Sequence, residues 1–145
     1  MNRTQVKRKN RASTWRGITL IFALVLMVGC EEDDPLENPL DVRANYLGVW
    51  QVTENTGVNH PQFYSVTISA GTDDDEIIIS GLYNEPNVRL GAIISGANMS
   101  IPLQSSEGIN FSGNGTANSN YSQIQVTFTA DDGSGPDVVE AVMVP

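Results

Sequence analysis

The chain has 145 residues, a net charge of −9 at neutral pH and a single cysteine. One cysteine excludes an intrachain disulfide, and the length suits one ordinary domain beside any targeting segment. The acidic excess argues against binding to nucleic acid, which requires a cationic surface.

The first 17 residues carry six basic side chains and no acidic one, and the predominantly apolar residues 18–28 follow them. A helix of 11 residues is about 16 Å long, too short for a hydrocarbon core of about 30 Å. A basic region, a short apolar run and a small residue at Gly29 are typical of a secretory signal peptide. The sequence therefore predicts a signal peptide over residues 1–29, with a buried core helix as the alternative.

Residues Met27, Val28, Gly29 and Cys30 resemble the lipobox of bacterial lipoproteins, in which cleavage occurs just before the cysteine. The commonest lipobox has leucine where this chain has Met27, and Leu26 stands one position earlier. The resemblance implies a diacylglycerol on the Cys30 thiol and an acyl chain on its new amino group. Two or more acyl chains anchor a protein stably to a membrane. The alternative is a plain secreted protein with a stray thiol.

Residues 31–34 are four consecutive acids, and Pro35 and Pro39 follow them. Acidic residues gain no attraction from anionic lipid, so residues 30–40 are predicted to form a solvated tether. An acidic run beside the lipidated cysteine also resembles the surface-export signal of Bacteroidota lipoproteins, and a generic linker remains the alternative. From Cys30 onward the chain has 17 acidic residues, two basic residues and no lysine, a net charge of −15.

From residue 41 onward, short runs of alternating apolar and polar residues are separated by Gly, Asn and Asp. This alternation is the pattern of half-buried β-strands. The connections are short and rich in turn residues, which predicts antiparallel pairing between neighbours in sequence. The eight predicted strands are residues 47–54, 62–70, 76–83, 87–95, 98–103, 109–117, 121–130 and 136–144.

Eight strands joined in this way form a meander, and closing the meander into a barrel removes the two open edges of a flat sheet. Gly113 and Gly115 stand inside a predicted strand, as glycines do where a barrel bends or two backbones approach closely. The predicted fold of residues 41–145 is therefore an all-β, antiparallel, eight-stranded barrel. A two-sheet β-sandwich is the alternative.

Residues 46–54, with the motif Gly48, Val49 and Trp50, resemble the opening strand of lipocalin-like proteins, where a G-x-W motif closes one end of the barrel. The layout of residues 41–145 is similar to that of small lipocalin-like lipoproteins of Bacteroidota. The resemblance implies that Trp50 packs at the barrel floor, often beside an arginine from a late strand. Arg89 is the one arginine in a predicted strand, and that strand is a middle one.

No catalytic constellation is visible in the sequence. His60 is the single histidine and precedes Pro61 in a predicted loop, whereas a nucleophilic triad needs a Ser or Cys held by His and an acid. Calcium takes six to eight oxygen ligands, but the acidic runs 73–76 and 131–137 lack the spacing of an EF-hand loop and suit hairpin turns. We therefore expect no enzyme activity, no metal and no cofactor.

Two binding functions stay open for a lipoprotein held in the cell envelope, at the outer membrane or on the cell surface, by a lipid on Cys30. In the first, the barrel interior holds a small apolar or sugar-like ligand. In the second, its own side chains fill the barrel, which docks onto an envelope protein in a structural or assembly role. The side chains predicted to face the interior, as ligand contacts or as core, are Trp50, Tyr64, Ile68, Phe111, Ile124, Phe128 and Met143.

Overall fold

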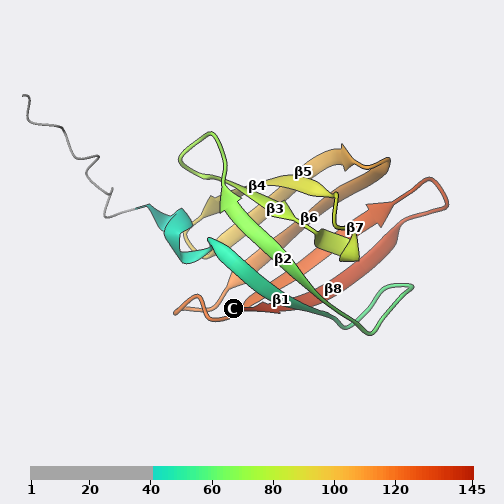
Figure 1. Ribbon diagram of the computed structural model, residues 1–145, viewed down its shortest axis with the longest axis horizontal. Helices are drawn as coiled ribbons and strands as arrows, with labels where there is room; N and C mark the ends of the chain where they lie inside the picture. The colour runs from blue at the N-terminus through green and yellow to red at the C-terminus, as the bar shows by residue number, and fades with distance from the viewer. Residues whose placement is uncertain (1–40) are drawn as a thin grey trace, which may run out of the picture. The chain divides into compact units, whose positions relative to one another are not determined.

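The structure is a computed structural model that describes residues 41–145, so the predicted signal peptide, Cys30 and tether lie outside the described residues. Eight antiparallel strands each pair with their neighbour in sequence, and β8 pairs with β1 to close a barrel (Figure 1). The predicted barrel is confirmed, and the sandwich alternative is wrong. The strands are β1 (Gly48–Glu54), β2 (Gln62–Ala70), β3 (Glu76–Ser80), β4 (Arg89–Ser95), β5 (Asn98–Ser106), β6 (Ile109–Ala117), β7 (Ile124–Asp131) and β8 (Asp137–Val144).

The core lies inside the barrel because successive side chains of a strand point to opposite faces of the sheet. In β7, Ile124, Val126 and Phe128 are buried, while the Gln and Thr residues between them lie on the outer face. Burial of apolar surface stabilises the fold by about 25 cal/mol per Å². The alternation seen in the sequence thus separates an apolar interior from a polar outer wall.

Two short 3₁₀-helices lie at opposite ends of the barrel. The helix η1 (Val42–Asn45) precedes β1 at the end where the chain enters the barrel, which we call the entry end. The helix η2 (Leu82–Asn84) connects β3 to β4 at the opposite end, which we call the far end (Figure 1). Leu82 is fully buried in the core, so η2 packs into the far end.

The predicted strand over residues 76–83 is wrong in its last three positions. It ends at Ser80, because Gly81 adopts a φ of 91° and turns the chain into η2. Glycine reaches positive φ without steric cost, whereas Tyr83, at a φ of 62°, carries the cost of a bulky side chain there. The tertiary contacts of η2 therefore override the β-propensity of the segment.

Two further strand boundaries differ from the prediction. β7 begins at Ile124 rather than at Tyr121, because Tyr121 adopts a φ of 55° and lies in the preceding turn. β5 continues to Ser106, because a β-bulge between Ile101 and Gln104 lets the strand resume its pairing with β6. A bulge inserts an extra residue into one strand and bends it without ending it.

Beyond this bulge, side chains replace part of the backbone ladder between β4 and β5. The Gln104 side chain donates to the Gly91 carbonyl at 2.7 Å and accepts from the Gly91 N–H at 2.9 Å. The Ser106 hydroxyl accepts from the Arg89 N–H at 3.0 Å. These bonds satisfy backbone groups that would otherwise lack a partner where the two strands diverge.

Candidate functional site

The barrel interior is packed with side chains of the chain itself. Every strand from β1 to β8 contributes at least two buried apolar side chains to the interior, among them Val66 and Ile68 of β2 and Ile77 and Ile79 of β3. A ligand-sized cavity would expose the side chains that line it, so no such cavity borders these residues. Tyr64, also predicted to face the interior, is half-buried and packs against the core. The other predicted side chains are each 2% exposed or less: Trp50, Ile68, Phe111, Ile124, Phe128 and Met143.

A chain of hydrogen bonds crosses the far end of the barrel. The Glu54 side chain is 1% exposed, and its Oε1 accepts from the Tyr64 hydroxyl at 2.6 Å. The Tyr64 hydroxyl oxygen accepts from the Tyr83 N–H at 3.0 Å, and the Tyr83 hydroxyl donates to Asp137 at 2.9 Å. Asp137 also accepts from the Val58 N–H at 3.1 Å. The network joins β1, β2, η2, β8 and the loop between β1 and β2.

The electrostatics of this far-end network favour protonated groups. Burial raises the pKa of Glu54; the hydrogen bond from Tyr64 opposes that shift and the charge of Asp137 adds to it. Burial and the bond to Asp137 raise the pKa of Tyr83 to about 12, and burial raises the pKa of Tyr64 further. Both tyrosines are therefore protonated and act as hydrogen-bond donors at neutral pH.

The G-x-W motif lies at the entry end, against η1. The Trp50 indole is 2% exposed and donates to the Tyr46 carbonyl at 2.7 Å. The Tyr46 hydroxyl donates to the Gly96 carbonyl at 2.9 Å, and its ring meets Tyr121 edge-on at 5.4 Å. Arg89, the arginine considered as a neighbour of Trp50, is exposed at the start of β4, toward the far end. The polar partner of Trp50 is therefore a backbone carbonyl.

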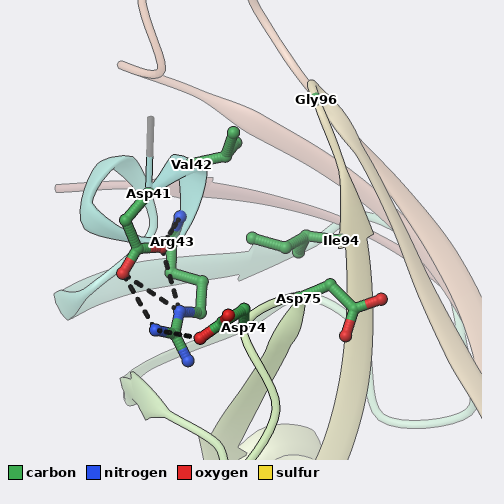
Figure 2. A pocket seen from close by; sticks show the side chains of 7 residues that line it. All are labelled: Asp41, Val42, Arg43, Asp74, Asp75, Ile94 and Gly96. Atoms are coloured by element: carbon green, nitrogen blue, oxygen red, sulfur yellow. Dashed lines mark hydrogen bonds and ion pairs between the residues drawn. The ribbon is translucent and has the colours of Figure 1, made fainter. Parts of the chain in front are cut away.

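Arg43 ties η1 to the loop between β2 and β3 (Figure 2). Its Nε and Nη2 each donate to the Asp41 carboxylate at 2.9 Å, and its Nη1 donates to the Asp73 carbonyl at 2.7 Å. The Arg43 hydrogen bond lowers the pKa of Asp41. The guanidinium is thus engaged by the protein itself, beside a pocket of ≈ 180 Å³. The pocket is lined by Asp41, Val42, Arg43, Asp74, Asp75, Ile94 and Gly96 (Figure 2).

A second hollow, of ≈ 360 Å³, lies on the outer wall over β7 and β8. The N–H of Asn55, the residue after β1, donates to the Glu140 carbonyl at 2.8 Å and brings the end of β1 to its edge. Two amides, one hydroxyl and one carboxylate give the hollow its polar groups. Its lining residues are Asn55, Gln125, Val126, Thr127, Glu140, Ala141 and Val142.

The remaining sequence candidates lie in loops. His60 is exposed after β1, with Nδ1 2.6 Å from the Gly57 carbonyl. In the loop after β7, the Asp131 and Asp132 carboxylates accept from the backbone N–H groups of Gly133 and Ser134, as in short turns. Within residues 41–145, no three His, Cys, Asp or Glu side chains come close enough to hold a metal ion. The same residues form no helix with the length and apolarity needed to cross a membrane.

The far-end network has no local sequence signature because its members are far apart along the chain. Glu54 lies in the first strand of the chain and Asp137 in the last, and Tyr83 lies in a segment predicted to be a strand. One signal was available: Glu54 alternates with Trp50 and Val52, which puts a carboxylate on the apolar face of β1. No family model, curated protein or solved structure matches the chain.

Proposed function

We propose that this protein is a lipid-anchored protein of the cell envelope, whose barrel is a solid scaffold that docks onto another envelope component through its outer wall. The observation that carries the proposal is the packed interior, to which each of the eight strands contributes at least two buried apolar side chains. Eight-stranded barrels either hold one small ligand or are filled by their own side chains. The packing supports the second case, which moves recognition to the outside.

The lipobox around Cys30 supports the anchor. Residues 30–40 span at most roughly 40 Å when fully extended, which keeps the barrel close to the membrane surface. Acylation of both the thiol and the amino group of Cys30 gives the two or more chains that stable anchoring needs. The anchor and the acidic tether favour a location at the outer membrane, with the tether as the candidate export signal.

Binding, rather than catalysis, is the proposed activity. Among residues 41–145, the one histidine is exposed in a loop, and the buried acid, Glu54, is hydrogen-bonded to a tyrosine. Acyl-transfer chemistry requires a nucleophile, a base and an orienting group within hydrogen-bond reach of one another. The far-end network supplies hydrogen bonds between structural elements and fits a role in stability.

Two measurements test the proposal. Replacing Cys30 with Ser should release the protein from the membrane fraction, and retention like wild type would contradict the anchor. Native mass spectrometry of the released C30S protein, purified without detergent from its own host, should give the bare mass. An additional mass that disappears on denaturation would overturn the solid scaffold and favour an interior ligand.

A further inference from the structure

Charged side chains of the described residues gather at the two ends of the barrel. Residues 41–145 contain 12 acidic and two basic side chains. Most lie in loops or at the first or last position of a strand, as Glu76, Arg89 and Asp131 do. Within the described strands, Glu140 is the one charged side chain that is neither first nor last. The outer wall between the two ends is therefore almost free of charge.

Three neighbouring strands of this wall carry a regular set of uncharged polar side chains. All are exposed, and they alternate with buried or small residues of β5, β6 and β7. Neighbours lie about 5 Å apart across strands, and the two rows lie about 7 Å apart along them. We call this set the polar grid: one row is Asn98, Thr116 and Gln125, and the next is Ser100, Asn114 and Thr127.

The polar grid keeps most of its hydrogen-bonding capacity free. Among the described residues, its side chains make one bond, from Thr116 Oγ1 to Asn98 Oδ1 at 3.5 Å, which is long. Gln125 and Thr127 also line the hollow of ≈ 360 Å³, so the grid continues into a concave surface. There Glu140 adds a carboxylate beside the two side chains.

The row that contains Gln125 continues around the barrel wall, over β8 and β1, to an exposed aromatic ring on β2. The register pairs Gln125 with Val142, Val142 with Thr53, and Thr53 with Phe63. Phe63 is 74% exposed. An aromatic ring presents an apolar face with a negative quadrupole, which suits the C–H face of a ring that is polar at its edges.

We infer that the polar grid, the hollow beside it and Phe63 form a binding site for neutral carbohydrate on the outer wall. This inference rests on the proposed function and names the chemistry of its partner. Anionic ligands require cations, which the site lacks, and a purely apolar ligand would leave the amides and hydroxyls unpaired. A cationic ligand would favour the acidic ends of the barrel. A neutral polyhydroxylated chain offers donors and acceptors that match the grid.

The test measures binding of the processed, lipidated protein, in mild detergent, to dextran, mannan and soluble β-glucan, with anionic polygalacturonate for comparison. At least one neutral polymer should bind, and polygalacturonate should not. The double substitution Gln125→Ala with Thr127→Ala should weaken binding about tenfold or more, because it removes two hydrogen-bonding side chains. The matched control is Thr67→Ala with Ser69→Ala, which removes two exposed polar side chains of β2 and should leave binding unchanged.

Thermal melting of both double variants checks that each folds like wild type, and Thr127→Val gives a shape-preserving loss of the hydroxyl. Equal effects of the two pairs, or no binding to any neutral polymer, would overturn the inference. Photo-crosslinking from position 127 in intact cells distinguishes a failure of the carbohydrate site from a failure of the proposed docking function. A crosslink to an envelope protein without polysaccharide binding would leave the proposed function standing, and no crosslink together with no polysaccharide binding would end both.

Discussion

The buried Glu54 carboxylate accepts a hydrogen bond from the Tyr64 hydroxyl at 2.6 Å, and no basic side chain among the described residues forms an ion pair with it. A carboxylate without a cationic partner is costly to hold away from water. Asp137 lies in the same network and adds negative charge. The far end of the barrel is therefore more stable when Glu54 carries a proton.

We expect the folded state to be more stable in mild acid than at neutral pH. Burial raises the folded pKa of Glu54 above its ordinary value of 4.5, so the folded state retains a proton that the unfolded chain releases. This contribution is complete below about pH 4.5 and is lost as the pH rises through the folded pKa. The half-buried Asp41 and the exposed Asp132 have lowered pKa values and act in the opposite direction. Urea unfolding at pH values from mild acid to neutral measures how the free energy of unfolding depends on pH.

The substitution Glu54→Gln isolates this contribution. Glutamine keeps an oxygen that can accept from Tyr64 but carries no charge, so unfolding free energy should depend less on pH than in wild type. At pH 8 the free energy of unfolding of the variant should equal that of wild type or exceed it by up to about 1 kcal/mol. Glu85→Gln, in an exposed loop position, is the control and should follow wild type. An unchanged pH dependence in the Glu54→Gln protein would refute the assignment.

Tyr83 should stabilise the far end through both its ring and its hydroxyl. Its ring meets Phe111 and Phe128 edge-on, at 6.3 Å and 6.1 Å between ring centroids. Tyr83→Phe keeps this packing and loses the bond to Asp137, so it should cost about 1 kcal/mol of unfolding free energy. Tyr83→Ala loses both and should cost about 3 kcal/mol. Chemical denaturation compares them, and equal losses would mean that the ring contacts contribute nothing.

The barrel was predictable because its strands repeat a simple physical pattern. In β7, alternation of apolar and polar residues shows which side chains face inward, and the short turn after it dictates antiparallel pairing with β8. Closure followed from the cost of leaving edges open. These features depend on residues that are close in sequence, where patterns are informative.

The far-end network and the outer hollow depend on residues that are distant in sequence. Residues 76–83 have the composition of a strand, yet Leu82 and Tyr83 leave the sheet because the far end offers them a buried site and aromatic neighbours. Glu54 shows its importance only once Tyr64 and Asp137 are seen around it. Tertiary contacts of this kind override local propensity, and a single sequence does not display them.

Arg43 should hold η1 against the barrel. Its side chain bonds Asp41 within the same segment and the Asp73 carbonyl across the entry end. Removing it with Arg43→Ala should speed hydrogen exchange of the Tyr46 N–H, which donates to the Arg43 carbonyl at 2.7 Å. Global melting should change little, because Arg43 and Asp41 pair within one short segment outside the strands of the barrel. Arg89→Ala removes the other arginine of the barrel and serves as control; the same exchange rates in both variants would contradict the anchoring role.

Gly113 should be the least replaceable glycine of the wall beneath the polar grid. It pairs with Phe128, and a Cβ at this position would lie 2.5 Å from the Thr127 carbonyl oxygen and 2.8 Å from the Phe128 Cα. Those atoms belong to the backbone of β7 and cannot yield without breaking the ladder, so Gly113→Ala should cost about 2–3 kcal/mol.

Gly91 provides the matched control for this substitution. A Cβ at Gly91 would meet the flexible end of Glu76 at 3.3 Å, so Gly91→Ala should cost less than about 1 kcal/mol. The expected difference corresponds to a melting temperature about 10 °C lower for Gly113→Ala in a domain of this size. Because β6 and β7 carry four of the six grid residues, the same variant should also lose polysaccharide binding, whereas Gly91→Ala should retain it. Equal melting temperatures of the two variants would show that β6 and β7 approach each other less closely than in the structure.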